Sequence, residues 1–311
     1  MNRQQGYTVV ELLVASAVML SVLAVVTALV HDGLIGVPVL EEAGDLHQRS
    51  RVAADQIAAA IRDAAAGGPF GPLADHVAAV LPRRVEDGPA AAGPGVLTVS
   101  SVPPNGAVSR LVAALDPASP MALIEAVSGC PTLATACGFN ANTRAMVFDD
   151  TGRSAILSVD AIGPGVLTIS DLSGGRSGSF AAGAHIAEIT VVTFHLDTAS
   201  RQLRRLVGGA TFPLADNVTT LRFDYVDETL STLALTALTD GPFRGAGLTM
   251  FDEDLRRIRA VRVTLRLETG VDILRGRDAR LFGRPGTADA RRMLPDIQTT
   301  FDVAIRNGGR P

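Results

Sequence analysis

The chain has 311 residues, of which 47% are hydrophobic and 19% are charged, which excludes a mainly disordered protein. Its 28 basic residues, all of them arginine, are dispersed and outnumbered by 32 acids, so the sequence shows no basic stripe for nucleic acid. Tryptophan is absent and aromatic residues make up only 4%, which argues against stacking platforms for single strands.

The first predicted element is an apolar helix. Residues 12–30 contain no charge and no proline, and these 19 residues would reach about 28 Å, close to the thickness of a bilayer core. A buried core helix rarely begins so near a chain end. A cleaved secretory signal has a shorter apolar region followed by small residues, whereas Val30 is followed by His31 and Asp32. The pattern therefore favours a membrane-spanning helix.

Glu11 does not fit a plain membrane anchor. A carboxylate at the edge of an apolar run is unfavourable in lipid and calls for a cationic partner. Cleavage between Gly6 and Tyr7 would create an amine four residues before Glu11, and the amine of one subunit could neutralise the carboxylate of another. Gly6 suits such a cut, because a peptidase can reach a carbonyl that has no side chain beside it.

This N-terminus resembles the class III signal of type IV prepilins and type II secretion pseudopilins, with tyrosine in place of the usual phenylalanine. The matching residues are Arg3, Gly6, Tyr7, Glu11, Leu12 and Leu13. The resemblance implies a leader peptide (1–6) removed by a prepilin peptidase, N-methylation of Tyr7, and a transmembrane and assembly helix (7–32). It also implies a single pass through the bacterial inner membrane, with a periplasmic head, before assembly with other pilins or pseudopilins into a pilus or pseudopilus.

An amphipathic helix is predicted at 39–66, continuing into the head after Gly33, Gly36 and Pro38, which should weaken or kink the first helix. Its apolar side comprises Leu46, Ala53, Ile57, Ala60, Ile61 and Ala64. Its polar side comprises Arg49, Arg51, Asp55, Arg62 and Asp63. In the pilin-like family the corresponding half of the helix lies against a sheet.

The rest of the chain (67–311) is predicted to be a β-rich head that begins with a loop at 67–94. Predicted strands lie at 96–102, 155–159, 165–170, 186–196, 203–207 and 218–226. Apolar and polar residues alternate at 261–268, with Glu268 on the polar side, and again at 301–305. This alternation is typical of an antiparallel sheet with one covered and one wet face, so the predicted class is α+β.

A second resemblance covers the head and points to PilW-like minor pilins and the related J-type pseudopilins. The matching segments are Phe194–Leu196, Leu203–Arg205, a loop at Pro213–Val218, Leu221–Tyr225, Ile258–Val263 and Phe301–Asn307. The resemblance implies a minor pilin, with a type II secretion minor pseudopilin as the alternative. A repeated GPGVLT segment at Gly93 and Gly163 fits either a duplication or a common turn-strand cassette.

Cys130 and Cys137 have six residues between them. In a cytosolic protein they would be two unrelated thiols, whereas in an exported protein they are a natural disulfide pair. Because the N-terminus predicts export of the head, we expect the disulfide.

No catalytic constellation and no cofactor motif is found in the sequence, and the chain is expected not to be an enzyme. His185 and His195 lie ten residues apart on one predicted strand, where a structural role is commoner than a ligand pair. Asp252, Glu253 and Asp254 would suit calcium, but a solvated acidic turn is the commoner explanation, so no metal site is predicted. The remaining alternative, a membrane-anchored periplasmic binding or hydrolytic domain, would not require cleavage after Gly6.

Overall fold

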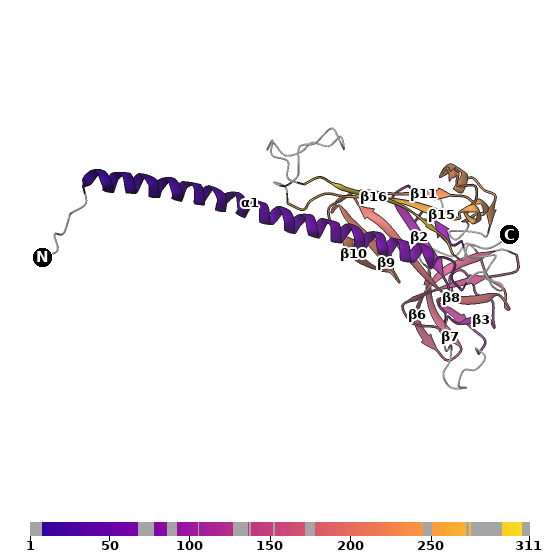
Figure 1. Cartoon of the computed structure of the whole chain (residues 1–311). Coiled ribbons are helices and arrows are strands. Elements are labelled where there is room, and N and C mark those ends of the chain that lie inside the picture. The colour runs from indigo at the N-terminus through magenta and orange to yellow at the C-terminus, as the bar shows by residue number, and fades with distance from the viewer. Residues whose placement is uncertain are drawn as a thin grey trace. The chain divides into compact units, whose positions relative to one another are not determined.

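A computed structural model describes most of the chain (Figure 1). The described residues are 8–67, 78–85, 92–104, 106–126, 136, 138–151, 153–171, 178–244, 251–271, 274 and 294–306. Contacts divide the chain into two compact units, Met1–Gln48 with Thr269–Pro295, and Arg49–Glu268 with Asp296–Pro311. We call the second unit the head.

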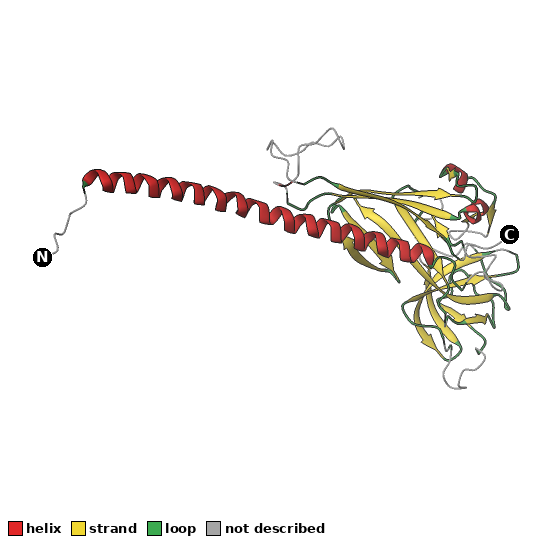
Figure 2. Ribbon diagram, viewed as in Figure 1, coloured by secondary structure: helices red, strands yellow, loops and turns green. Residues whose placement is uncertain are grey.

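A single α-helix, α1 (Val9–Arg62), runs from the first unit into the head (Figure 2). The two helices predicted at 7–32 and 39–66 are therefore one element. Its backbone stays helical through Gly33, Gly36 and Pro38, where the sequence predicts a weakened or kinked helix. Proline removes one donor from the helical ladder, and the turns on both sides keep the helix going.

The predicted amphipathic pattern of α1 is confirmed. The apolar side is buried at Leu46, Ala53, Ile57, Ile61 and Ala64 and half-buried at Ala60. The polar side is exposed at Arg51, Asp55, Arg62 and Asp63, and half-buried at Arg49. The buried stripe follows from helical spacing of apolar residues, which lets one face join a core.

The chain leaves α1 through a turn that is held by the neighbouring strand. Ala65 N donates to the carbonyl oxygen of Ser100 at 2.8 Å, and Val102 N donates to that of Ala66 at 2.7 Å. Gly67 has φ +71°, and a Cβ there would lie 2.7 Å from the carbonyl oxygen of Val102. Glycine is needed at this position both for the left-handed backbone and for the close approach.

The head contains a four-stranded antiparallel sheet in the order β12-β11-β15-β16. Its strands are β11 (Val218–Val226), β12 (Thr232–Leu233), β15 (Ala260–Leu267) and β16 (Ile297–Ala304). The predicted alternation is confirmed on β15, where Val261, Val263, Leu265 and Leu267 are fully buried. On the same covered face Ser50 Oγ of α1 lies 3.2 Å from Thr299 Oγ1.

Glu268 departs from the predicted alternation. It was expected on the wet face, yet it is buried and forms an ion pair with Arg201. The strand β15 ends at Leu267, so Glu268 follows the last residue of the strand and need not obey its alternation of faces. The backbone N–H of Glu268 donates to the carbonyl oxygen of Asn217 at 2.9 Å.

A larger antiparallel sheet follows the path β1-β2-β8-β5-β6-β7-β4, with β9 and β3 also pairing with β8 and β10 pairing with β9. Its strands are β1 (Val80–Leu81), β2 (Val96–Ser101), β3 (Val108–Arg110), β4 (Met121–Leu123), β5 (Thr143–Phe148), β6 (Ser154–Gly163), β7 (Val166–Asp171), β8 (His185–Asp197), β9 (Gln202–Val207) and β10 (Ala210–Ala215). Shorter elements are β13 (Phe243–Arg244), β14 (Phe251–Asp252), and two 3₁₀ helices, η3 (Thr236–Leu238) and η5 (Glu253–Arg257).

Part of the larger sheet closes into a small barrel. The strand β3 pairs with β8 and β4 pairs with β7, while a bridge between Leu111 and Ile124 joins the ends of β3 and β4. Val112 N donates to the carbonyl oxygen of Leu123 at 2.9 Å across this seam. The ladder therefore runs β3-β8-β5-β6-β7-β4 and back to β3, which removes the free sheet edges.

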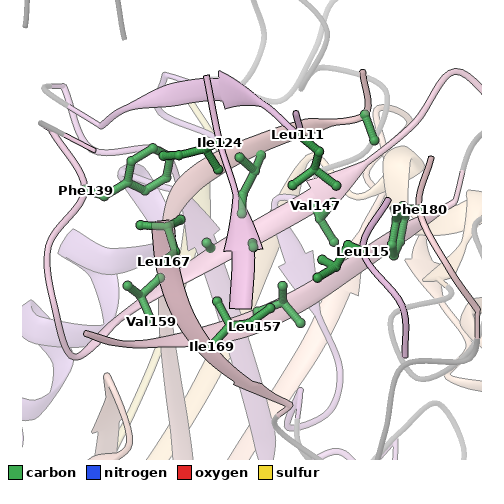
Figure 3. Close-up of a cluster of buried hydrophobic side chains, with 14 of the residues drawn as sticks. Leu111, Leu115, Ile124, Phe139, Val147, Leu157, Val159, Leu167, Ile169 and Phe180 are labelled. Atoms are coloured by element: carbon green, nitrogen blue, oxygen red, sulfur yellow. The ribbon is translucent and has the colours of Figure 1, made fainter. Parts of the chain in front are cut away.

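The barrel interior is filled by aliphatic and aromatic side chains (Figure 3). They include Leu111, Leu115, Ile124, Phe139, Val147, Leu157, Val159, Leu167, Ile169, Phe180 and Ile186. The strand β8 connects this barrel to the rest of the head, because its first half pairs with β5 and its second half pairs with β2.

Other sequence expectations are corrected by the fold. The segment Pro213–Ala215, predicted as a loop, ends strand β10, where proline is tolerated because β10 is an edge strand. The predicted loop at 67–94 contains the short strand β1. The two GPGVLT copies differ in backbone, because Gly165 is left-handed (φ +64°) in the β6–β7 hairpin and Gly95 is not. This difference favours the turn-strand cassette.

Candidate functional site

The N-terminus of α1 carries a capping box made by Thr8 and Glu11. The backbone N–H and the hydroxyl of Thr8 both donate to Glu11 Oε2 at 2.9 Å, and Glu11 N donates to Thr8 Oγ1 at 3.3 Å. The carboxylate thus satisfies donors that the first turn of a helix leaves without intrahelical partners. It also lies at the positive end of the helix dipole.

The helix that follows is apolar on every side. All residues from Val9 to Val30 are exposed in the isolated chain, and this 22-residue segment is long and apolar enough to cross a membrane. At 1.5 Å per residue it spans roughly 33 Å, against roughly 30 Å for a hydrocarbon core. A helix without a polar face needs an apolar environment around it.

The hydroxyl groups in this segment are compatible with lipid. Ser16, Ser21 and Thr27 each donate to the backbone carbonyl four residues earlier, at 2.8, 2.8 and 2.7 Å. Because lipid offers no hydrogen-bond partners, internal bonds of this kind lower the cost of placing a hydroxyl in a membrane.

Several predicted site residues lie outside the described residues. These are Gly6 and Tyr7 at the predicted cleavage point, and the pair Cys130 and Cys137. Glu11 is described and lies at the first turn of α1, as predicted. Sequence reasoning missed Thr8, although the spacing Thr-x-x-Glu directly before an apolar run is the signature of a capping box.

The histidines considered as ligands have separate surroundings. His185 stacks on Phe148 with ring centroids 5.2 Å apart, and His195 Nε2 lies 3.3 Å from Arg84 Nη2. They occupy opposite ends of β8, roughly 30 Å apart at strand spacing. The two imidazoles therefore do not form one site.

The acidic run after β14 has a structural role. Asp252 is buried, and its carboxylate accepts the backbone N–H of Gly241 at 2.5 Å and that of Asp254 at 2.8 Å. The expected solvated turn is therefore wrong for Asp252, which caps the 3₁₀ helix η5. Among the described residues, no group of three or more His, Cys, Asp or Glu side chains is placed to hold a metal ion.

Residues 1–27 match the family description "Prokaryotic N-terminal methylation motif". The match spans Gly6, Tyr7 and Glu11 and most of the apolar segment. The N-terminus is that of a prepilin-like protein. No curated protein and no solved structure matches the chain. A prepilin-like N-terminus with an apolar helix indicates membrane anchoring, processing by a prepilin peptidase and assembly with other pilins, as in type IV pilins and pseudopilins.

Proposed function

We propose that this prepilin-like chain is a minor pilin of a type IV pilus system, a non-enzymatic subunit that is inserted in a filament or primes one. The prepilin peptidase cuts after Gly6, Tyr7 becomes the methylated first residue, and the head lies in the periplasm before assembly. The observation that carries the proposal is the apolar helix Val9–Val30, uncovered on all sides, with a lone carboxylate in its first turn.

Glu11 has two roles in this proposal. In a single subunit its carboxylate is held by the two Thr8 donors, which makes the charge less unfavourable at the membrane edge. A carboxylate can accept further hydrogen bonds, so a methylated amine on the Tyr7 of a neighbouring subunit can join the same group. The added charge pair favours a subunit docked in register over a subunit alone in lipid.

The head supports a low-copy position. It contains a four-stranded sheet and a closed barrel in addition to the end of α1. A head of this size would crowd a filament in which every subunit carried it, so a tip or priming role suits it better than a shaft role.

A type II secretion minor pseudopilin is the second candidate, because the same methylation motif serves that class. The resemblance of the head segments, including Leu221–Tyr225 on β11, to PilW-like proteins favours the pilus. A membrane-anchored binding or hydrolytic domain would need neither cleavage after Gly6 nor the Glu11 charge.

Replacing Glu11 tests the proposal. Glu11→Leu should reduce co-purification with partner pilins by roughly tenfold, the effect of losing about 1.4 kcal/mol of charge-assisted pairing. It should leave the melting temperature of the head unchanged. Glu11→Gln keeps an acceptor for Thr8 but removes the charge, so it should show the same assembly loss with the helix cap retained.

The matched control is Glu41→Leu, the same change at an exposed carboxylate of α1 beyond the apolar segment. It should co-purify like the wild type. Undiminished co-purification of both Glu11 variants would refute the charge-pair account, and a lowered head melting temperature would assign Glu11 to the fold.

A further inference from the structure

The edges of the described sheets are protected, with one exception. The barrel has no free edge, and the edge strands β1, β12, β13 and β14 have two residues each. The other edge of the larger sheet, β10, carries Pro213 and a register shift between Pro213 and Ala215. Short strands, proline and bulges are the usual ways in which proteins keep other chains from pairing with a sheet.

The part of β11 that β12 leaves open is also occupied. Phe223 N donates to the carbonyl oxygen of Pro94 at 2.7 Å, and Val218 N donates to that of Arg201 at 2.9 Å. The remaining edge belongs to β16, which has eight residues and pairs with β15 without a register shift. No strand lies beyond β16 among the described residues.

The hydrogen-bond pattern identifies the backbone groups on this open edge. Ile305 N donates to the carbonyl oxygen of Arg259 at 2.9 Å, so residues at odd positions of β16 direct their N–H and C=O groups toward β15. The even positions direct theirs away from the sheet. These are Gln298, Thr300, Asp302 and Ala304, whose side chains are all exposed.

A row of charged side chains crosses the wet face of the sheet and ends at the same edge. Asp224 on β11, Arg262 on β15 and Asp302 on β16 lie opposite one another in register. Arg262 Nε and Nη2 donate to the two carboxylate oxygens of Asp302 at 2.8 and 2.9 Å. Asp224 forms its ion pair with Arg222 on the same strand and Arg262 pairs with Asp302, so the row ends on Asp302, whose side chain is 53% exposed.

We propose that the open edge of β16 binds an extended segment of another protein subunit by strand addition, with an arginine or lysine opposite Asp302. The free N–H and C=O groups would form the ladder, and the basic residue would continue the alternation of charge across the wet face. Apolar side chains opposite Phe301, which is half-buried, and Val303 would extend the covered face. This surface lies on the head and is independent of the role proposed for α1.

A peptide with the sequence of residues 260–267 (AVRVTLRL) is a suitable probe. In β15 this sequence already places an arginine opposite Asp302 and valines opposite Phe301 and Val303. Fluorescently labelled peptide would be titrated by anisotropy into the full-length protein in detergent. Saturable binding is expected. A peptide with aspartate in place of the arginine that corresponds to Arg262 should bind roughly fivefold more weakly or worse.

Two variants locate the binding on the edge. Thr300→Pro removes an outward N–H without removing a bond to β15, and Ala304→Lys places a charged side chain on the edge. Each should weaken peptide binding roughly fivefold or more. The matched control, Ala210→Lys, makes the same change at an exposed alanine on the protected strand β10 and should bind like the wild type.

The proposal fails if the wild type shows no saturable binding, or if Ala304→Lys and Ala210→Lys bind the peptide equally. If Thr300→Pro lowers the melting temperature, the pair of lysine variants decides. Glu11→Leu protein should bind the peptide normally, so a negative result here leaves the co-purification test of α1 unaffected.

Discussion

The two ends of α1 differ both in their sequence pattern and in what surrounds them. From Val9 to Val30 every residue is exposed, whereas between Arg49 and Arg62 one face is buried and the other is wet. Both segments are regular helix, so helix formation does not distinguish them. The difference teaches that a helix without a polar face needs an apolar surrounding, whereas a helix with one apolar face can join a folded head.

The polar side chains of the two segments also differ in their hydrogen-bond partners. In the first segment the hydroxyls of Ser16, Ser21 and Thr27 bond back to their own helix. In the second, Arg49 Nη1 donates to the carbonyl oxygen of Asp216 at 3.2 Å and Ser50 contacts Thr299. The first segment is self-sufficient in hydrogen bonding, as a lipid-facing helix must be, and the second is fastened to strands.

The largest expected effect is a difference between the two segments of α1 in how much an alanine substitution destabilises the head. Ile57 is fully buried, so Ile57→Ala should lower the free energy of unfolding of the head by about 2–5 kcal/mol. Leu20 is exposed, and Leu20→Ala should leave that free energy unchanged. Chemical denaturation of the full-length protein in detergent measures both. An equal loss for Leu20→Ala would show that the apolar segment belongs to the head core.

A smaller effect concerns the compartment in which the head folds. If the head folds outside the cytosol, Cys130 and Cys137 should form a disulfide that stabilises it by roughly 2–3 kcal/mol. Non-reducing peptide mapping of exported protein should find the two cysteines in one linked peptide, and reduction should lower the melting temperature. Two free thiols in exported protein would contradict the assignment.

Local patterns predicted much of the fold. The strand predicted at 218–226 is β11 with the same bounds, and alternation in β15 identified its buried face. These predictions succeed because burial of alternate residues leaves a period in the sequence itself. The resemblance to prepilins likewise rests on a short contiguous segment, residues 1–27.

Features that depend on distant pairing were not predicted. Closure of the barrel rests on one bridge, Leu111 with Ile124, between two strands of three residues each. Such short strands leave too few residues for an alternation to show. The buried position of Glu268 depends on Arg201, which is 67 residues away in the sequence. The Thr8 cap could have been predicted from the Thr-x-x-Glu spacing. It was missed because Glu11 was interpreted only as an assembly residue.

The open edge of β16 extends the comparison to the head. The sequence of this strand shows alternation at 301–305 but does not reveal whether another strand lies beside it. That property appears only when all the edges are compared, because β10 carries Pro213 and β16 carries neither proline nor a register shift. The edge would give the head a contact of its own, in addition to the helix contact.

The most direct test of the central claim is mass spectrometry of the N-terminal peptide of the protein extracted from membranes of a strain with an active prepilin peptidase. The account predicts a mature chain that begins at Tyr7 with a methylated amine, since the methylation motif covers residues 1–27 and Gly6 precedes the cut. A Gly6→Leu variant should retain its leader and serve as the uncleaved standard. A wild-type chain that still begins at Met1 would contradict the assignment as a processed pilin-like subunit.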